Sequence, residues 1–186
     1  MATQSTDMSF KQQFNLVLVL SLIIAAIEVI NLLTGRTLNQ FGLIPRDAAG
    51  LLGVITAPLL HGSIWHFLSN IIPFAVFSFL LLQHGTSRYL QVTIICTVVS
   101  GVLVWIFARS AIHVGASGLI YGYFGYLVLA GFLSKKFKLI LISLFVGIAY
   151  GTLIFGVLPV SRYISWESHL FGLLVGLGCA YTMHKK

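Results

Sequence analysis

The chain has 186 residues, of which 58% are hydrophobic and only 8% are charged, and its mean hydropathy is +1.00. Soluble domains carry about 25% charged residues, so this composition excludes an ordinary soluble domain and predicts an integral membrane protein. A nucleic-acid site would need a basic face on a soluble domain. The composition excludes such a domain, so the net charge of +7 does not predict a nucleic-acid partner.

Residues 1–12 are polar and are expected to form a short cytoplasmic tail, followed by one membrane domain over residues 13–186. Six apolar stretches of about 16 to 20 residues follow, close to the ~20 residues that a membrane-spanning helix needs. They are residues 14–33, 66–82, 89–108, 116–133, 139–158 and 168–183. None alternates like the strands of a β-barrel. The predicted fold class is therefore an all-α membrane protein, a bundle of six transmembrane helices.

The one long connection, residues 34–65, is rich in glycine and proline but also contains apolar runs such as 51–55. A solvated linker would not be so apolar. We expect this segment to fold back on the outer membrane surface as short interfacial pieces.

The positive charges are distributed unequally between the two sides of such a bundle. One side receives every lysine and Arg88, and the other receives the remaining arginines, Arg36, Arg46, Arg109 and Arg162. The lysines are Lys11, Lys135, Lys136, Lys138, Lys185 and Lys186. The positive-inside rule then places both termini in the cytoplasm, so the second, fourth and sixth helices begin at the outer face.

Ser117 begins the fourth apolar stretch within the run Gly115-Ala116-Ser117-Gly118. A serine in a membrane helix is usually structural. Flanking glycines, however, allow a substrate to come close, and a helix N-terminus presents unpaired N–H groups that can stabilise an oxyanion. Residue 119 is Leu, so the run is not the Gly-x-Ser-x-Gly turn of soluble hydrolases.

His169 lies at the start of the sixth stretch, where an ionisable side chain is costly and indicates function. Gly172 and Gly176 share its helical face, and Gly118 lies on a similarly smooth face of the fourth stretch. Small residues at this spacing let two helices pack closely. We therefore expect the Ser117 hydroxyl to come within hydrogen-bond reach of the His169 ring, as activation of a nucleophile requires.

Three further residues cluster at these helix starts. His66 and Asn70 are four residues apart at the beginning of the second stretch, where they could donate hydrogen bonds to an oxyanion or join helices. Tyr121 lies one turn after Ser117 and could stack on the histidine.

Glu28, inside the first stretch, is expected to be protonated or paired with Asn31 or a loop residue.

The chain resembles the rhomboid intramembrane serine proteases. The motifs that carry the resemblance are His-x4-His-x3-Asn over residues 61–70, Gly-x-Ser-Gly-x2-Tyr over 115–121 and His-x2-Gly-x3-Gly over 169–176. The resemblance implies a six-helix bundle with a Ser–His dyad below the membrane surface. The chain departs from the family in the first outer loop, which has Pro45-Arg46-Asp47 and lacks the Trp-Arg pair that is frequent there.

Carried over by motif, Ser117 would be the nucleophile and His169 the general base. The other motif residues would support them: His66, Asn70 and the Ser117 backbone N–H would bind the oxyanion, Gly115 would line the site, and Tyr121 would back the histidine. The resemblance implies cleavage of transmembrane protein substrates within the lipid bilayer. Because the core is short and shows no transit-like leader, we expect that bilayer to be a bacterial inner membrane. No metal ligands cluster in the sequence, and no metal or cofactor is expected.

Two other functions remain open. A rhomboid-like pseudoenzyme would capture membrane clients without cutting them, although such relatives usually lose the serine or the histidine. A transporter or channel would need more intramembrane acidic groups than Glu28 or an inverted repeat. The oligomeric state, natural substrate and cleavage site are not encoded in these patterns.

Overall fold

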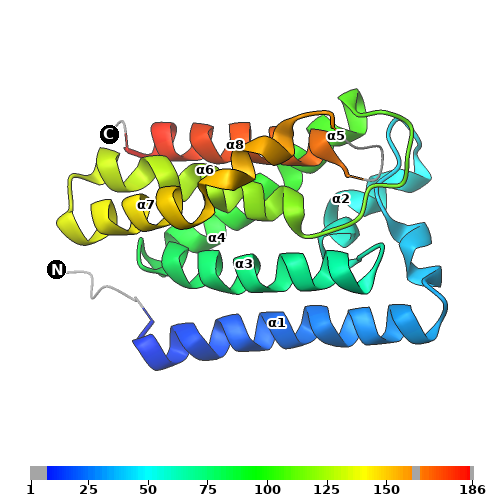
Figure 1. Ribbon diagram of the computed structural model, residues 1–186, viewed down its shortest axis with the longest axis horizontal. Coiled ribbons are helices and arrows are strands. Elements are labelled where there is room, and N and C mark those ends of the chain that lie inside the picture. The colour runs from blue at the N-terminus through cyan, green and yellow to red at the C-terminus, as the bar shows by residue number, and fades with distance from the viewer. Residues whose placement is uncertain (1–7, 161–163, 185–186) are drawn as a thin grey trace, which may run out of the picture.

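The computed structural model describes residues 8–160 and 164–184, which form a bundle of long helices lying along one common direction (Figure 1). The described residues contain no strand, only an isolated bridge between Leu43 and His113. The bundle consists of α1 (Phe10–Leu33), α3 (Ile64–Leu82), α4 (Thr86–Ile95), α5 (Gly101–Phe107), α6 (Ser117–Ser134), α7 (Phe137–Tyr150) and α8 (Trp166–His184). The predicted all-α membrane bundle is confirmed.

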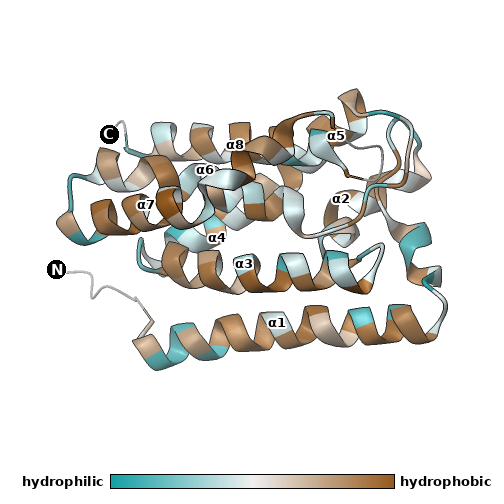
Figure 2. Cartoon of the chain, viewed as in Figure 1, coloured by the Kyte–Doolittle hydropathy of each residue, from teal (hydrophilic) through white to brown (hydrophobic). Residues whose placement is uncertain are grey.

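Five helical segments of the described chain are long and apolar enough to cross a membrane: Phe10–Leu33, Ile64–Leu82, Thr86–Phe107, Ser117–Ser134 and Phe137–Val157. The sixth, α8, has 19 residues but carries Glu167 and His169 near its start, which lowers its hydropathy. It still packs along α6 within the bundle (Figure 1). Figure 2 shows hydrophobic residues over most of α1, α3 and α7, with hydrophilic residues gathered near the helix ends.

Helix α1 begins at Phe10, four residues before the predicted start of the first stretch. Ser9 accepts a hydrogen bond from the Gln12 backbone, and the Gln12 side chain bonds back to the Ser9 backbone. This capping box stabilises a helix start among polar residues. Helix α1 therefore begins within the polar residues that precede the apolar run.

Two of the spans change their helical type before they end. A π-helical turn, η4 (Cys96–Ser100), joins α4 to α5, and a 3₁₀ segment, η5 (Gly151–Val157), continues α7. Such changes of period reorient the side chains and carbonyls that follow. The consequence for η5 is that its carbonyl groups reach the site described below.

The connection between α1 and α3 folds into the expected short pieces, η1 (Thr37–Phe41), η2 (Ala49–Leu52), α2 (Gly53–Thr56) and η3 (Ala57–Leu59). Arg46 holds this connection on the end of α5, because its guanidinium donates to the carbonyls of Ile106 (3.1 Å) and Ala108 (2.7 Å). Trp105 of α5 donates in turn to the Asp47 carbonyl at 2.8 Å. A tryptophan from another segment thus contacts the Arg46-Asp47 turn, in a loop that has none of its own.

Helix α6 is the centre of the bundle. Its most hydrophobic window is 61% buried, against 17–28% for the other four candidate spans. Glycines let α8 approach it closely: a Cβ on Gly172 would overlap the Gly118 carbonyl, and one on Gly176 would overlap the Gly122 carbonyl. This close approach brings the starts of α6 and α8 together.

The helix directions bring the two described ends of the chain to the same end of the bundle. The start of α1, the end of α8 and the connection between α6 and α7 lie at the same end of the molecule (Figure 1). Helices α3, α6 and α8 all begin at the opposite end. Three members of the counted charge distribution, Arg162, Lys185 and Lys186, lie outside the described residues.

Candidate active site

A cavity of about 430 Å³ lies at the starts of α3, α6 and α8. Five of the residues singled out in the sequence line it: His66, Asn70, Ser117, Tyr121 and His169. They come from three helices that are distant in sequence but begin at the same end of the bundle. The fold therefore gathers these polar groups around one space.

Ser117 is the first residue of α6 and is buried, with 9% of its surface exposed. The first N–H groups of an α-helix have no intrahelical acceptor, and no capping side chain accepts from those of α6. Such N–H groups point outward from a helix N-terminus, and Ser117 is the first residue of this one. The serine thus combines a hydroxyl with nearby unpaired backbone donors.

His169 is the fourth residue of α8 and is held on two sides. Its ring lies parallel to the Tyr121 ring, with centroids 4.1 Å apart and an interplanar angle of 5°. Its Nδ1 lies 2.9 Å from the carbonyl oxygen of Gly156, and the Tyr121 hydroxyl donates to the Leu153 carbonyl at 2.8 Å. Both carbonyls belong to η5, so that segment contacts the histidine and its stacking partner together.

The two residues share the cavity without bonding to each other. Among the hydrogen bonds of the described residues, none joins the Ser117 hydroxyl to the His169 ring. The expected direct contact is therefore not made in this conformation. Hydrogen bonds between catalytic groups are often long in ligand-free enzymes and tighten when substrate binds, so the shared cavity still permits the pairing.

His66 is oriented toward the start of α6. The Gly62 N–H donates to His66 Nδ1 at 3.4 Å, which leaves the proton of a neutral ring on Nε2. A Cβ on Gly115 would lie only 2.6 Å from His66 Nε2 and 3.6 Å from Ser117 Oγ. Gly115, with φ of +124°, therefore leaves room for a donor nitrogen beside the serine.

Asn70 lines the cavity, but its side-chain amide makes its hydrogen bonds within its own helix. Its Nδ2 donates to the His66 carbonyl at 2.7 Å and lies 3.4 Å from Ser69 Oγ, while Oδ1 is buried without a partner. The N–H groups of Asn70 would have to turn toward the cavity before they could bind an oxyanion there. Of the two predicted side-chain donors, His66 is the better placed.

A second serine–histidine contact, which the sequence analysis did not single out, lies on the wall of the same cavity. His113 Nδ1 lies 2.5 Å from Ser165 Oγ, His113 Nε2 lies 3.1 Å from the Arg109 carbonyl, and Ser165 Oγ lies 2.6 Å from Ser168 Oγ. Burial lowers the pKa of His113 below its usual value, which favours the neutral ring. Because a carbonyl only accepts, Nε2 carries the proton and Nδ1 accepts from Ser165.

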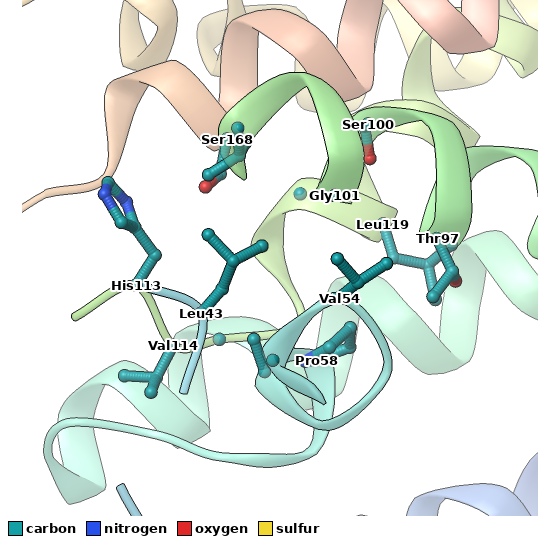
Figure 3. Close-up of a pocket in the computed structure, with 15 residues that line it drawn as sticks. Leu43, Val54, Pro58, Thr97, Ser100, Gly101, His113, Val114, Leu119 and Ser168 are labelled. Carbon is teal, nitrogen blue, oxygen red and sulfur yellow. The ribbon is translucent and has the colours of Figure 1, made fainter. Parts of the chain in front are cut away.

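His113 lines both the main cavity and a smaller one of about 40 Å³, while Ser165 lines only the main cavity and Ser168 only the smaller one. In Figure 3, His113 and Ser168 lie on one side of the small cavity and Thr97 and Ser100 on the other. The only signal in the sequence was a histidine four residues before Ser117, inside an otherwise apolar run. Its partner Ser165 is too distant in sequence to be inferred from spacing.

Glu167 does not contribute to the cavity. Its Oε1 lies 3.6 Å from Arg109 Nε and 3.4 Å from the Arg109 backbone nitrogen. The carboxylate thus ties the start of α8 to the segment before α6. It is not hydrogen-bonded to the His169 ring, although the two residues are only two positions apart.

The fold and cavity define a multi-pass α-helical membrane protein with a serine and a histidine at one internal site. Residues 48–186 match the family described as Rhomboid domain, and the chain belongs to the rhomboid family. Uncharacterized proteins of Mycobacterium tuberculosis and Mycobacterium bovis are 36% identical over 166 residues, which cover 84% of this chain and 69% of theirs. An uncharacterized protein of Mycobacterium leprae is 31% identical over 84% of this chain and 66% of its own length.

Proposed function

We propose that this protein is a serine endopeptidase that cleaves transmembrane segments of other membrane proteins. The observation that carries the proposal is the cavity at the starts of α3, α6 and α8, which Ser117 and His169 line together. Membership of the rhomboid family, whose members are generally intramembrane serine proteases, supports the same reading. The cavity lies inside a membrane bundle, so its substrates are membrane-embedded chains.

In the proposed reaction, Ser117 Oγ attacks the carbonyl carbon of the scissile peptide bond while its proton passes to His169 Nε2. The tetrahedral oxyanion accepts hydrogen bonds from the Ser117 backbone N–H and from His66 Nε2. The proton on Nε2 then passes to the departing amine nitrogen, which leaves an acyl-enzyme. A water molecule, deprotonated by the same nitrogen, releases the acid and restores the hydroxyl.

The oxyanion donors carry much of the catalysis in this proposal. Removing one such donor typically costs about 3 kcal/mol of transition-state stabilisation. His66 is assigned as a donor because the Gly62 N–H occupies its Nδ1, and Gly115 leaves its Nε2 close to Ser117. Asn70 is assigned a second donor role that requires its amide to turn.

The proposed substrates contain a transmembrane segment with small or helix-breaking residues near the outer interface. A regular helix engages its own carbonyls in hydrogen bonds, so the cut segment must unwind. The segment would enter sideways past α7 and η5, where Leu153 lines the cavity. The proposed location is a bacterial inner membrane, with both termini in the cytoplasm and the cavity toward the outer face. The excess of lysines at one end of the bundle supports this orientation.

The second candidate function is that of a rhomboid-like protein that binds membrane clients without cleaving them. The absent hydrogen bond between Ser117 and His169 is the observation that favours it. Against it, both side chains are present, buried and on the same cavity. The reactivity of Ser117 distinguishes the two functions.

The deciding experiment treats the detergent-solubilised protein with a fluorophosphonate probe, which labels activated serines. We expect labelling of the parent protein and none of Ser117→Ala or His169→Ala. Ser165→Ala is the matched control, because Ser165 lines the same cavity and contacts a different histidine. It should label like the parent.

Labelling of Ser117→Ala at the parent level would contradict the assigned nucleophile, and loss of labelling in Ser165→Ala alone would transfer the role to Ser165. An unlabelled parent that still captures a transmembrane peptide in liposomes would favour the binding protein. Cleavage of that peptide in liposomes by the parent, but not by Ser117→Ala, would establish the protease.

A further inference from the structure

The His169 ring has one nitrogen bound and one available. Nδ1 lies 2.9 Å from the Gly156 carbonyl oxygen, and a carbonyl oxygen can only accept a hydrogen bond. Nδ1 must therefore carry the proton, and a neutral ring keeps its lone pair on Nε2. This is the form that a general base needs in order to take a proton from a serine.

In serine proteases with a catalytic triad, a carboxylate selects this form of the histidine. Loss of that carboxylate's function costs about 10⁴-fold in turnover, because the wrong tautomer then predominates. The nearest acid in sequence, Glu167, is bound to Arg109 instead. Among the described residues, the Gly156 carbonyl is the acceptor that His169 Nδ1 uses.

Position 156 accepts little other than glycine. A Cβ there would overlap the Tyr121 hydroxyl and lie 3.3 Å from His169 Nδ1. The Tyr121 hydroxyl is itself fixed by the Leu153 carbonyl of the same 3₁₀ segment. The absence of a side chain thus lets the carbonyl of Gly156 reach the ring edge while Tyr121 covers the ring face.

We propose that the Gly156 carbonyl is the positioning group of this site, which holds His169 in the Nδ1–H form in place of a carboxylate. This inference rests on the proposed function, because it assigns His169 the role of general base. In the reaction, His169 Nδ1 keeps its proton and its hydrogen bond to the Gly156 carbonyl. Only Nε2 gains and loses the proton that is transferred. A neutral carbonyl stabilises the resulting imidazolium less than a carboxylate does, so the enzyme is slower than a triad protease.

The test combines the tautomer of His169 with the reactivity of Ser117. Histidine labelled with nitrogen-15 is incorporated into the full chain in detergent micelles, and the His169 signals are assigned by their loss in His169→Ala. We expect the Nδ1–H form of His169 in the parent at neutral pH. In Gly156→Ala we expect a shift toward the Nε2–H form and a fluorophosphonate labelling rate at least about tenfold lower.

Gly151→Ala is the matched control. It lies on the same η5 segment, but its Cβ would meet no atom within 4 Å. It should keep both the parent tautomer and the parent labelling rate. A parent His169 in the Nε2–H form would overturn the proposal, as would a Gly156→Ala protein that labels at the parent rate.

The two proposals fail in different ways. An unlabelled parent with His169 in the Nδ1–H form would refute the protease and leave only the hydrogen bond from His169 Nδ1–H to the Gly156 carbonyl standing. A labelled parent with the other tautomer would refute the positioning role and leave the protease intact. If Gly156→Ala does not fold, the tautomer of the parent alone decides.

Discussion

At the scale of single residues, buried polar groups connect the first helix to the site. Glu28, inside the apolar α1, pairs with the loop residue Arg36, with Nη2 and Oε1 2.9 Å apart. Arg36 Nη1 also donates to the His61 carbonyl at 2.6 Å, and Asn31 and Asn39 donate to the same carbonyl. Of the alternatives that the sequence left for Glu28, the structure has the pair with a loop residue. The His61 backbone, just before α3, is thereby fixed from three directions.

The His61 side chain has the opposite character. Its ring is fully buried, packs edge-on against His66 and Phe67, and has no partner on either nitrogen. Burial is the largest cause that lowers the pKa of His61 from 6.5 to about 3, with smaller contributions from His66 and Arg36. The ring is neutral in the folded protein over the whole physiological range.

This burial predicts a pH-dependent stability. Between pH 6.5 and about 3 the unfolded chain binds a proton on His61 that the folded chain does not. The free energy of unfolding therefore falls as pH falls through this window, by up to about 1.4 kcal/mol per pH unit. His61→Phe should remove this part of the slope, which is measured by unfolding in detergent at several pH values. Parallel profiles for the parent and the variant would show that His61 does not contribute.

At the scale of elements, the contact between α6 and α8 positions the serine and histidine. The backbones of the two helices are in direct contact, because Gly172 and Gly176 of α8 face the carbonyls of two glycines of α6. Small residues allow this approach where apolar side chains would gain nothing over lipid. The starts of the two helices are held together by packing along their length, without a bond between the two candidate catalytic side chains.

The element-scale prediction compares two glycines of α8. Gly176→Ala should destabilise the protein by about 1–3 kcal/mol and reduce labelling of Ser117, because its Cβ overlaps the Gly122 carbonyl. Gly178→Ala meets no atom within 4 Å and should be neutral or stabilising by up to about 1 kcal/mol. Unfolding by denaturant in micelles measures both. Equal stabilities for the two variants would mean that the helices do not pack as described.

At the scale of the whole molecule, three helices start at one end of the bundle and carry every side chain assigned to the site. Antiparallel neighbours α1 and α7 run the other way, so the connection between α6 and α7 lies at the opposite end (Figure 1). That end holds Lys135, Lys136 and Lys138. The charge bias and the helix directions together support the proposal that the lysine-rich end faces the cytoplasm.

Accessibility of introduced cysteines tests this orientation. Ser110→Cys lies in the exposed segment before α6, and Lys136→Cys lies in the exposed connection after it. In intact spheroplasts a membrane-impermeant maleimide should label Ser110→Cys at once and Lys136→Cys only after lysis. The parent protein is the blank, because Cys96 and Cys179 are buried. The reverse pattern would invert the proposed topology.

Much of the fold was predictable, and the errors have physical causes. Each predicted span lies within a few residues of an observed helical segment, five of which are long and apolar enough to cross a membrane. A run of apolar residues long enough to cross lipid has few other folded states. Helix α1 begins earlier than its apolar run predicts, because a capping box extends the helix into the preceding polar residues. The π-turn at Cys96–Ser100 and the 3₁₀ segment after α7 left no periodic signal, because both continue an apolar run.

The sequence by itself determined the membrane bundle and the residues that gather at one end of it, because hydrophobic length and helix direction are local properties of the chain. Only the tertiary structure decided which nitrogen of His169 is bound, which cation pairs with Glu28, and that His113 contacts Ser165. His113 and Ser165 are 52 positions apart, and each of the other two contacts joins a helix to a different element whose placement beside it is a tertiary property. The contact of His169 ends on a backbone carbonyl, a group that every residue has and that therefore leaves no mark in a sequence.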